Sequence, residues 1–170
     1  MTQINPESFL GGGLRYVCEV IAPDGIVLQR GEHTNLIPQV GVDYLAGLFM
    51  GISVPVTDWY VGIYEANYVP VRSVKSSDLP GTVGESTAYT QSERPSWNKE
   101  YDGVGKLTSI NGRAEFTFTA DKTLYGGFVV SQPAKGGNSG VLLSITRFPT
   151  PYTVPAGSTF RLYQEVNVVA

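Results

Sequence analysis

Several residue types that carry protein chemistry are scarce in this sequence. Its 170 residues include one cysteine, Cys18, and one histidine, His33. A single cysteine excludes an internal disulfide, and this pair is too small a ligand set for a structural zinc site. Charged residues make up 16% of the chain, and no Lys/Arg cluster offsets the net charge of -3. We therefore expect no metal, no cofactor and no nucleic-acid partner.

Long apolar runs are missing as well. The longest, residues 36–50, is interrupted by Gln39 and Asp43 and falls short of the ~20 residues that a membrane span needs. The first residues lack the basic region and apolar stretch of a secretory signal. Cys18 lies in an alternating pattern typical of a buried strand thiol. We expect no membrane contact and synthesis in a reducing cytoplasm.

The chain is instead rich in turn-forming residues. It has 20 glycines and 11 prolines, spaced between short apolar and β-branched segments. Such punctuation is typical of many strands joined by tight turns. We predict an all-β protein, a β-sandwich or jelly-roll-like antiparallel fold with one helix at about residues 36–50. Leu36, Val40, Tyr44 and Leu48 form the helical stripe, with Leu45 and Phe49 beside it and Asn35 as its predicted cap.

Two hairpins are predicted from turn chemistry. The strand at 14–21 is followed by Pro23-Asp24-Gly25 and a returning strand from Ile26. The second hairpin has Asn111-Gly112 at its turn and strands on either side, "GKLTSI" and "RAEFTFTA". "DWYVGIYE", "GGFVVS", "GVLLSITRF" and "STFRLYQEVNVV" are predicted as further strands, with "PTPYTVPAG" as a connection.

The domain organisation follows from these segments. We expect a flexible N-terminal arm at residues 1–13 and a single β-sandwich domain at 14–170. Within that domain, residues 65–105 mix Pro, Ser, Gly and aromatics without a steady period and form a long loop excursion. Loops of this length in compact domains usually serve a function, so the excursion is the first place to look for binding.

The run Gly137-Asn138-Ser139-Gly140 has two interpretations. It is similar to the loop that carries the nucleophile in chymotrypsin-like proteases, and His33, Asp43 or Asp58, and Ser139 follow their chain order. It also fits a plain turn whose glycines take positive φ between "FVVS" and "VLLS". His33 and Ser139 lack the flanking residues of those proteases. We favour the turn and predict no enzymatic activity.

Acidic and aromatic side chains in and near the excursion give two further options. Glu85, Glu93, Glu100 and Asp102 include acids that could pair on a sugar, a weak case for a glycosidase. The rings could instead bind glycan without cleaving it, or contact a protein, because Trp and Tyr serve both purposes. The candidate glycan-binding residues are Trp59, Tyr68, Tyr89 and Trp97.

Four stretches carry a resemblance to a known class of proteins. "NLIPQVGVDYLAGLF", "WYVGIYEANYVP", "TLYGGFVVS...KGG..GVLLS..RF" and "TVPAGSTFRLYQEV" resemble the small virion structural proteins of tailed bacteriophages that decorate or cement the capsid. The likeness covers residues 35–69 and 124–168. Its motifs are patterns of apolar, Gly and Pro positions.

The resemblance implies a β-sandwich or jelly-roll protein at the capsid surface of the virion, synthesised in the host cytoplasm. Its partner would be the major capsid protein, and we expect a homo-oligomer, a trimer or a dimer, that stabilises the assembled shell. A tail-associated or tail-fibre domain that recognises host surface glycan is the alternative. No catalytic residue is implied. The candidate partner-contact residues are Phe9, Trp97, Tyr101, Lys135 and Asn138.

Overall fold

The computed structural model describes residues 13–167 of the chain. In this range the strands form two antiparallel sheets, which confirms the predicted all-β, sandwich-like fold with a short helix. The larger sheet has the order β2-β1-β9-β5-β4, with β6 also paired to β9, and the smaller has the order β3-β7-β8. The strands are β1 (Arg15–Ile21), β2 (Val27–Thr34), β3 (Tyr60–Tyr64), β4 (Glu100–Tyr101), β5 (Lys106–Thr108), β6 (Ala114–Thr117), β7 (Lys122–Val130), β8 (Leu142–Val154) and β9 (Thr159–Asn167).

The main core lies between the two sheets. Alternation places Tyr16, Cys18 and Val20 of β1 on the inner face, where they are fully buried. Aromatic rings from the facing strands fill the same space; Phe148 of β8 and Phe160 of β9 lie 5.9 Å apart between ring centroids. The core contains side chains of β1, near the start of the described sequence, and of β9, at its end. Packing of this core therefore holds the two ends of the described sequence together.

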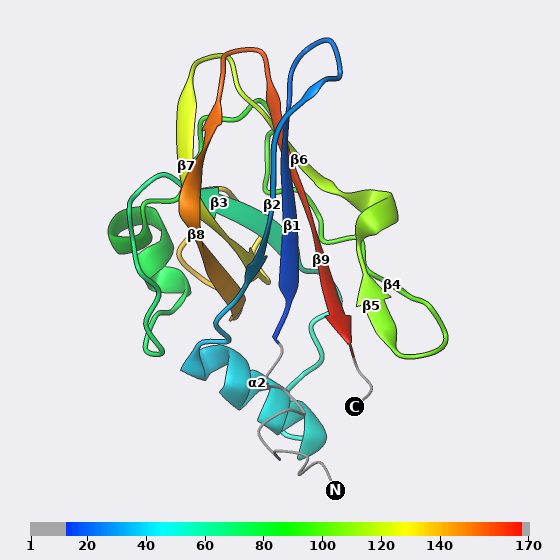
Figure 1. The fold of residues 1–170 in the computed structure, drawn as a ribbon. Coiled ribbons are helices and arrows are strands. Elements are labelled where there is room, and N and C mark those ends of the chain that lie inside the picture. The colour runs from blue at the N-terminus through cyan, green and yellow to red at the C-terminus, as the bar shows by residue number, and fades with distance from the viewer. Residues whose placement is uncertain (1–12, 168–170) are drawn as a thin grey trace, which may run out of the picture.

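The smaller sheet is covered on its other face too. Val74, Leu79 and Val83, from residues 65–105, pack there against Phe128 and Ile145 of the sheet. Leu79 and Val83 belong to the second of two helical turns that follow Val74, and Figure 1 shows these turns in green beside β7 and β8. The excursion thus supplies apolar side chains to a second core cluster. The turns are η1 (Ser76–Asp78) and η2 (Leu79–Val83), and a third, η3 (Ile110–Gly112), follows β5.

The helix is α2 (Gln39–Phe49), shorter than the predicted 36–50. Pro38 stands at its N-cap, because the chain before it is still extended: Leu36 pairs with Ile145 of β8. The predicted cap, Asn35, has another role, accepting a hydrogen bond from the Leu14 amide at 2.7 Å. Figure 1 shows α2 crossing below the strands.

One predicted hairpin is confirmed and the other is wrong. β1 and β2 pair around the turn that contains Asp24, as expected. β5 and β6 do not pair with each other. Both pair with β9, at successive positions along the same strand, and η3 replaces the predicted Asn111-Gly112 turn. The long β9 can satisfy the hydrogen bonds of two short strands, which local turn chemistry does not reveal.

The predicted connection "PTPYTVPAG" is also wrong in part. β8 continues through Val154, where it pairs with Lys122 of β7. The strand tolerates Pro149 and Pro151 because they fall in an irregularity of the ladder: β7 pairs with β8 at Arg147 and again at Tyr152, and residues 148–151 between them have no β7 partner.

Two glycines let aromatic rings lie flat across the smaller sheet. Gly62 is paired with Phe128, and Gly126 with Tyr64. A Cβ at Gly126 would lie 2.1 Å from the Tyr64 ring and 2.2 Å from the Thr146 carbonyl oxygen. The Tyr64 hydroxyl donates to that carbonyl at 2.8 Å. Glycine at 126 is therefore a requirement of close packing.

Candidate functional site

Four strongly exposed apolar side chains lie at and just beyond the end of α2. Phe49 is 84% exposed, Met50 71%, Ile52 71% and Val54 82%. Four large apolar side chains in six positions form an unusual concentration in a protein with two well-filled core clusters. Contiguous apolar surface of this kind marks interaction sites. We call residues 49–54 the helix-end segment.

Local hydrogen bonds fix the path of the helix-end segment. Gly51 has a φ of +68°, which reverses the chain after the last helical turn. The amides of Ile52 and Ser53 both donate to the Gly47 carbonyl, at 2.8 and 3.0 Å. The apolar side chains are therefore presented by a hydrogen-bonded turn, so little backbone entropy remains to be lost on binding.

The chain leaving the segment is fixed to the core. The Tyr44 hydroxyl accepts a hydrogen bond from the Val56 amide at 2.7 Å. The same ring meets Trp59 edge-on, with 5.5 Å between ring centroids. These contacts connect the helix-end segment to the sandwich.

Further exposed apolar side chains lie at other turns. Between β4 and β5, the Asp102 carboxylate accepts hydrogen bonds from three backbone amides, of Val104, Gly105 and Lys106. The amide bonds from Lys106 and Val104 lower the pKa of Asp102. This turn presents Tyr101, 61% exposed, and Val104, 80% exposed. The other exposed apolar residues include Ile26, Val27, Leu28, Val69 and Val71.

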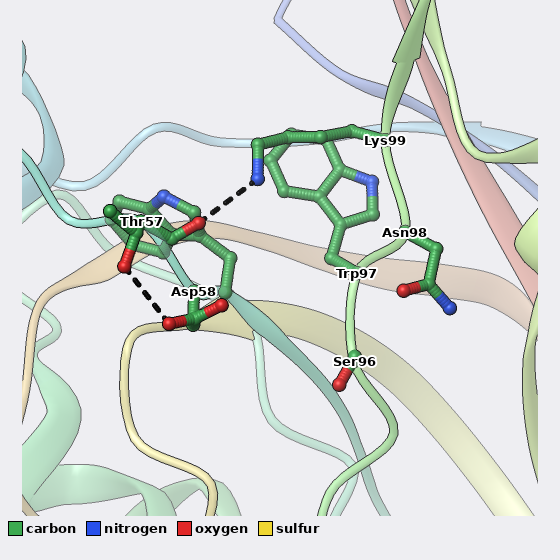
Figure 2. A pocket seen from close by; sticks show the side chains of 7 residues that line it. Thr57, Asp58, Ser96, Trp97, Asn98 and Lys99 are labelled. Carbon is green, nitrogen blue, oxygen red and sulfur yellow. Dashed lines mark hydrogen bonds between the residues drawn. The ribbon is translucent and has the colours of Figure 1, made fainter.

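A small polar pocket lies beside both tryptophans of the chain. Its volume is about 260 Å³. Figure 2 shows Thr57 and Asp58 on one side and Ser96 and Trp97 on the other, with the Asn98 side chain turned away. Lys99 reaches across the Trp97 ring to the Thr57 carbonyl at 3.3 Å. The pocket is lined by Thr57, Asp58, Trp59, Ser96, Trp97, Asn98 and Lys99.

The chemistry of this pocket suits a small polyhydroxylated ligand better than an apolar one. Asp58 offers carboxylate oxygens, Ser96 a hydroxyl and Lys99 an ammonium group. Trp97 is 9% exposed and Trp59 6%, so the indoles form walls and floor and do not offer an open ring face. Among residues 13–167 there is no cluster of three metal-ligating side chains.

The run around Ser139 forms the turn between β7 and β8. Gly136 and Gly140 have φ values of +74° and +86°, as the turn interpretation predicts. Ser139 accepts a hydrogen bond from the Gln132 side chain at 2.7 Å. His33 lies on β2, where its Nε2 is 2.9 Å from the Tyr152 hydroxyl. Within residues 13–167, no hydrogen bond joins His33 to Ser139.

The aspartates of the hypothetical triad also have other partners. Asp43 accepts from the Gln39 side chain at 2.7 Å, and Asp58 accepts from the Thr57 hydroxyl at 2.9 Å. His33, Asp43, Asp58 and Ser139 thus each form a hydrogen bond with a residue outside this set of four.

A buried ion pair holds the turn after β7 in place. The Arg94 guanidinium donates to both Glu85 carboxylate oxygens, at 2.7 and 2.6 Å, and both side chains are 0% exposed. Arg94 also donates to the carbonyls of Gln132 and Gly137, and the Gly136 amide donates to Glu85. Glu85, considered from sequence as a catalytic acid, is a structural anchor between the excursion and the β7–β8 turn.

The residues predicted as partner contacts differ in availability. Tyr101 and Asn138 are exposed, whereas Trp97 is buried. Lys135 bonds within the molecule: its ammonium donates to the carbonyls of Tyr89 and Gln91, at 2.9 and 2.7 Å. Phe9 and residues 1–12 of the predicted arm lie outside the described residues.

The candidate glycan-binding rings are mostly core residues. Tyr89 is 2% exposed and packs edge-on against Phe116, with 5.0 Å between centroids. Burial raises the pKa of Tyr89 well above its usual range, with Glu85 adding to the effect. Tyr68 is half-buried against Tyr64. Trp59, Tyr89 and Trp97 therefore offer no open ring face for stacking, and of these three only the tryptophans line the pocket.

The sequence pattern does not predict the helix-end segment. It places Phe49 beside the helical stripe of 36–50 and gives no sign that this side chain is exposed. The available signal was the continuation of large apolar residues past Gly51, where the helical period ends. Such a run predicts either a buried strand or an exposed apolar turn, and the sequence alone does not separate them.

Comparison with known proteins gives no relative: no family model matches the chain, and neither does any curated protein sequence. No helix in the described range is long and apolar enough to span a bilayer.

Proposed function

We propose that this protein is a virion structural protein of the capsid-decoration kind, which binds an assembled shell through protein–protein contacts. The helix-end segment is the observation that carries the proposal. It presents Phe49, Met50, Ile52 and Val54 to solvent on a turn fixed by hydrogen bonds. Exposed apolar side chains on a rigid support are the kind of anchor that dominates protein interfaces.

The low charge and the sandwich architecture support the same conclusion. A net charge of -3 gives little long-range steering, so affinity has to come from close contact and repetition. On a shell, many identical sites lie at fixed spacing, and any chain that engages more than one site gains from the high effective concentration. The resemblance to tailed-phage decoration proteins, described from the sequence, points to the major capsid protein as the partner.

The test is cosedimentation with expanded and unexpanded capsids of the phage that carries this gene. A triple variant, Phe49→Ser, Ile52→Ser and Val54→Ser, is expected to lose at least about tenfold in affinity, because interface anchors each contribute about 1–2 kcal/mol or more. Its free energy of unfolding should stay within about 0.5 kcal/mol of wild type for each change, since these side chains are exposed.

A matched control removes apolar surface elsewhere. Val69 and Val71 are 61% and 52% exposed, and replacing both with serine should leave capsid binding unchanged. Equal binding by wild type and the triple variant would remove the helix-end segment from the proposal. Failure of wild type to bind either capsid form, or to protect it against heat, would remove the decoration function itself.

A second function is favoured by the pocket at Trp59 and Trp97. A tail-associated domain that recognises host glycan would use such a polar, sugar-sized recess. Both tryptophans of the chain line it, so intrinsic fluorescence reports on this site. Titration with a panel of monosaccharides should change the emission of wild type and of Asp43→Asn, an exposed control, but not of Asp58→Asn. Absence of any response from wild type would leave the capsid role alone.

A further inference from the structure

The larger sheet has two edge strands, β2 and β4, and β2 is the longer one. β4, at the opposite margin, is only two residues long. In the smaller sheet, the free sides of β3 and β8 are bridged by neighbouring segments of the described chain. Those bridges are Tyr60 to Ser96, Tyr64 to Glu85 and Leu36 to Ile145.

The outer side of β2 therefore offers unpaired backbone groups ahead of its last residue, Thr34, whose carbonyl accepts a hydrogen bond from the Thr146 hydroxyl at 2.6 Å. Between residues 13 and 167, its ladder partner is β1 alone, and Figure 1 shows it along one side of the sheet that contains β1 and β9. The strand contains no proline, and its register is regular from Gln29 to Thr34, after an irregularity near Leu28. Such an edge is a template for pairing with another strand.

The charges on β2 define which strand fits. Arg30 and Glu32 flank Gly31 and face solvent on the outer side of the sheet, 59% and 49% exposed at their side chains. If a second β2 lies antiparallel with Gly31 opposite Gly31, each Arg30 faces the Glu32 of the other copy. A parallel arrangement in register would place like charges side by side instead. Opposite charges across an antiparallel pair are stabilising, and like charges are destabilising.

We propose that two copies of this protein pair through β2, antiparallel and centred on Gly31, so that their larger sheets become continuous. The arrangement is isologous: one two-fold axis passes between the two glycines and each ion pair occurs twice. It is independent of the partner proposed above. Because the regular stretch is short, the contact area is small and the dimer is expected to depend on protein concentration.

Existing contacts leave both charges available for this role. Arg30 lies 3.8 Å from Glu19, a carboxylate already engaged by Arg113 and Arg161. Glu32 accepts from Arg15 at 2.8 Å, in an exposed pair. Exposed pairs of this kind contribute little to folding, so either charge can be reversed with a small effect on the monomer.

The experiment uses two charge-reversal variants, measured alone and mixed by analytical ultracentrifugation across a concentration series. Arg30→Glu has acids at both positions, and Glu32→Arg has bases at both. Each alone should raise the homodimer dissociation constant by about tenfold or more. Mixed in equal amounts, they should form a heterodimer as tight as the wild-type dimer, because every facing pair is again opposite in charge.

A third variant controls for net charge. Glu115→Arg reverses an exposed acid on β6, away from β2. It should dimerise like wild type. Its heterodimer with Arg30→Glu should be weaker than the heterodimer of the two β2 variants, because only one of its two facing pairs is opposite in charge. Thermal unfolding of each variant verifies that the fold is intact. In wild type, amide exchange in β2 should slow as protein concentration rises.

Three results would overturn the proposal. The first is a wild-type protein that stays monomeric, with β2 amide exchange independent of concentration. The second is a dimer that survives either reversal alone, and the third is a pair of variants that do not associate when mixed. Pairing of β2 with a foreign strand only, detected as protection by a partner and not by self-concentration, would count as the first result.

Discussion

The ion pair between Arg94 and Glu85 gives the sharpest stability prediction. Both side chains are 0% exposed, and the guanidinium also donates to two backbone carbonyls. Glu85→Gln keeps the shape of the side chain but removes its charge and replaces an acceptor oxygen with a donor. A buried guanidinium is then left without its counter-charge, which typically costs about 3–5 kcal/mol.

That cost is measurable by chemical denaturation and by calorimetry. For a chain of this length, about 2–4 °C of melting temperature is lost per kcal/mol. The variant should therefore melt about 6–20 °C below wild type. The effect should be local as well as global, because the Gly136 amide donates to the same carboxylate. Amide exchange in residues 136–140 should become faster than in wild type.

Glu100→Gln is the matched control. Glu100 is exposed and accepts a hydrogen bond from the Asn111 side chain at 2.8 Å. The same chemical change there should cost about 1 kcal/mol or less. The double variant Glu85→Leu and Arg94→Met should be less destabilised than the sum of its single changes, because neither charge is left alone. A Glu85→Gln protein that unfolds within about 1 kcal/mol of wild type would refute the reasoning.

Two further outcomes test the packing and the electrostatics of the sandwich. Gly126→Ala places a methyl group against the Tyr64 ring and a backbone carbonyl. We expect the free energy of unfolding, measured with denaturant, to fall by about 1–3 kcal/mol. Gly25→Ala is the control for backbone strain, because Gly25 has a positive φ but a methyl group there meets no atoms. Burial lowers the pKa of His33 below 6.5, although Glu32 opposes the shift. The folded state therefore binds this proton more weakly than the unfolded chain, and stability falls as pH drops below about 6.5 through the lowered value. His33→Gln should show a flatter dependence between about pH 7.5 and 5.5; parallel curves would contradict the assignment.

Much of the strand pattern could be predicted from local signals. The turn at Asp24, the strands at "GGFVVS" and "STFRLYQEV", and the glycine-rich loop at 136–140 all lie where the pattern placed them. Each depends on alternation or on positive φ, properties of a few adjacent residues. The Asn111-Gly112 hairpin failed because its strands found a stronger partner in β9, far along the chain.

The site residues were less predictable for the same reason. Trp97 and Lys135 were expected on the surface, but the first is buried and the second bonds to two carbonyls of a distant loop. Phe49 was expected beside the apolar stripe of a helix and is 84% exposed. The identity of an aromatic or apolar residue does not reveal whether its side chain is buried in the core or exposed at a binding surface.

The sequence by itself determined the class of fold, because alternating side chains and turn-forming glycines encode strands locally. Its single histidine, its single cysteine and its lack of clustered charge are likewise read directly from the composition. Only the tertiary structure decided which strands meet, which rings are buried and which margin of a sheet is left open. Those outcomes depend on contacts between residues distant in the chain, and each is settled by competition among many possible partners.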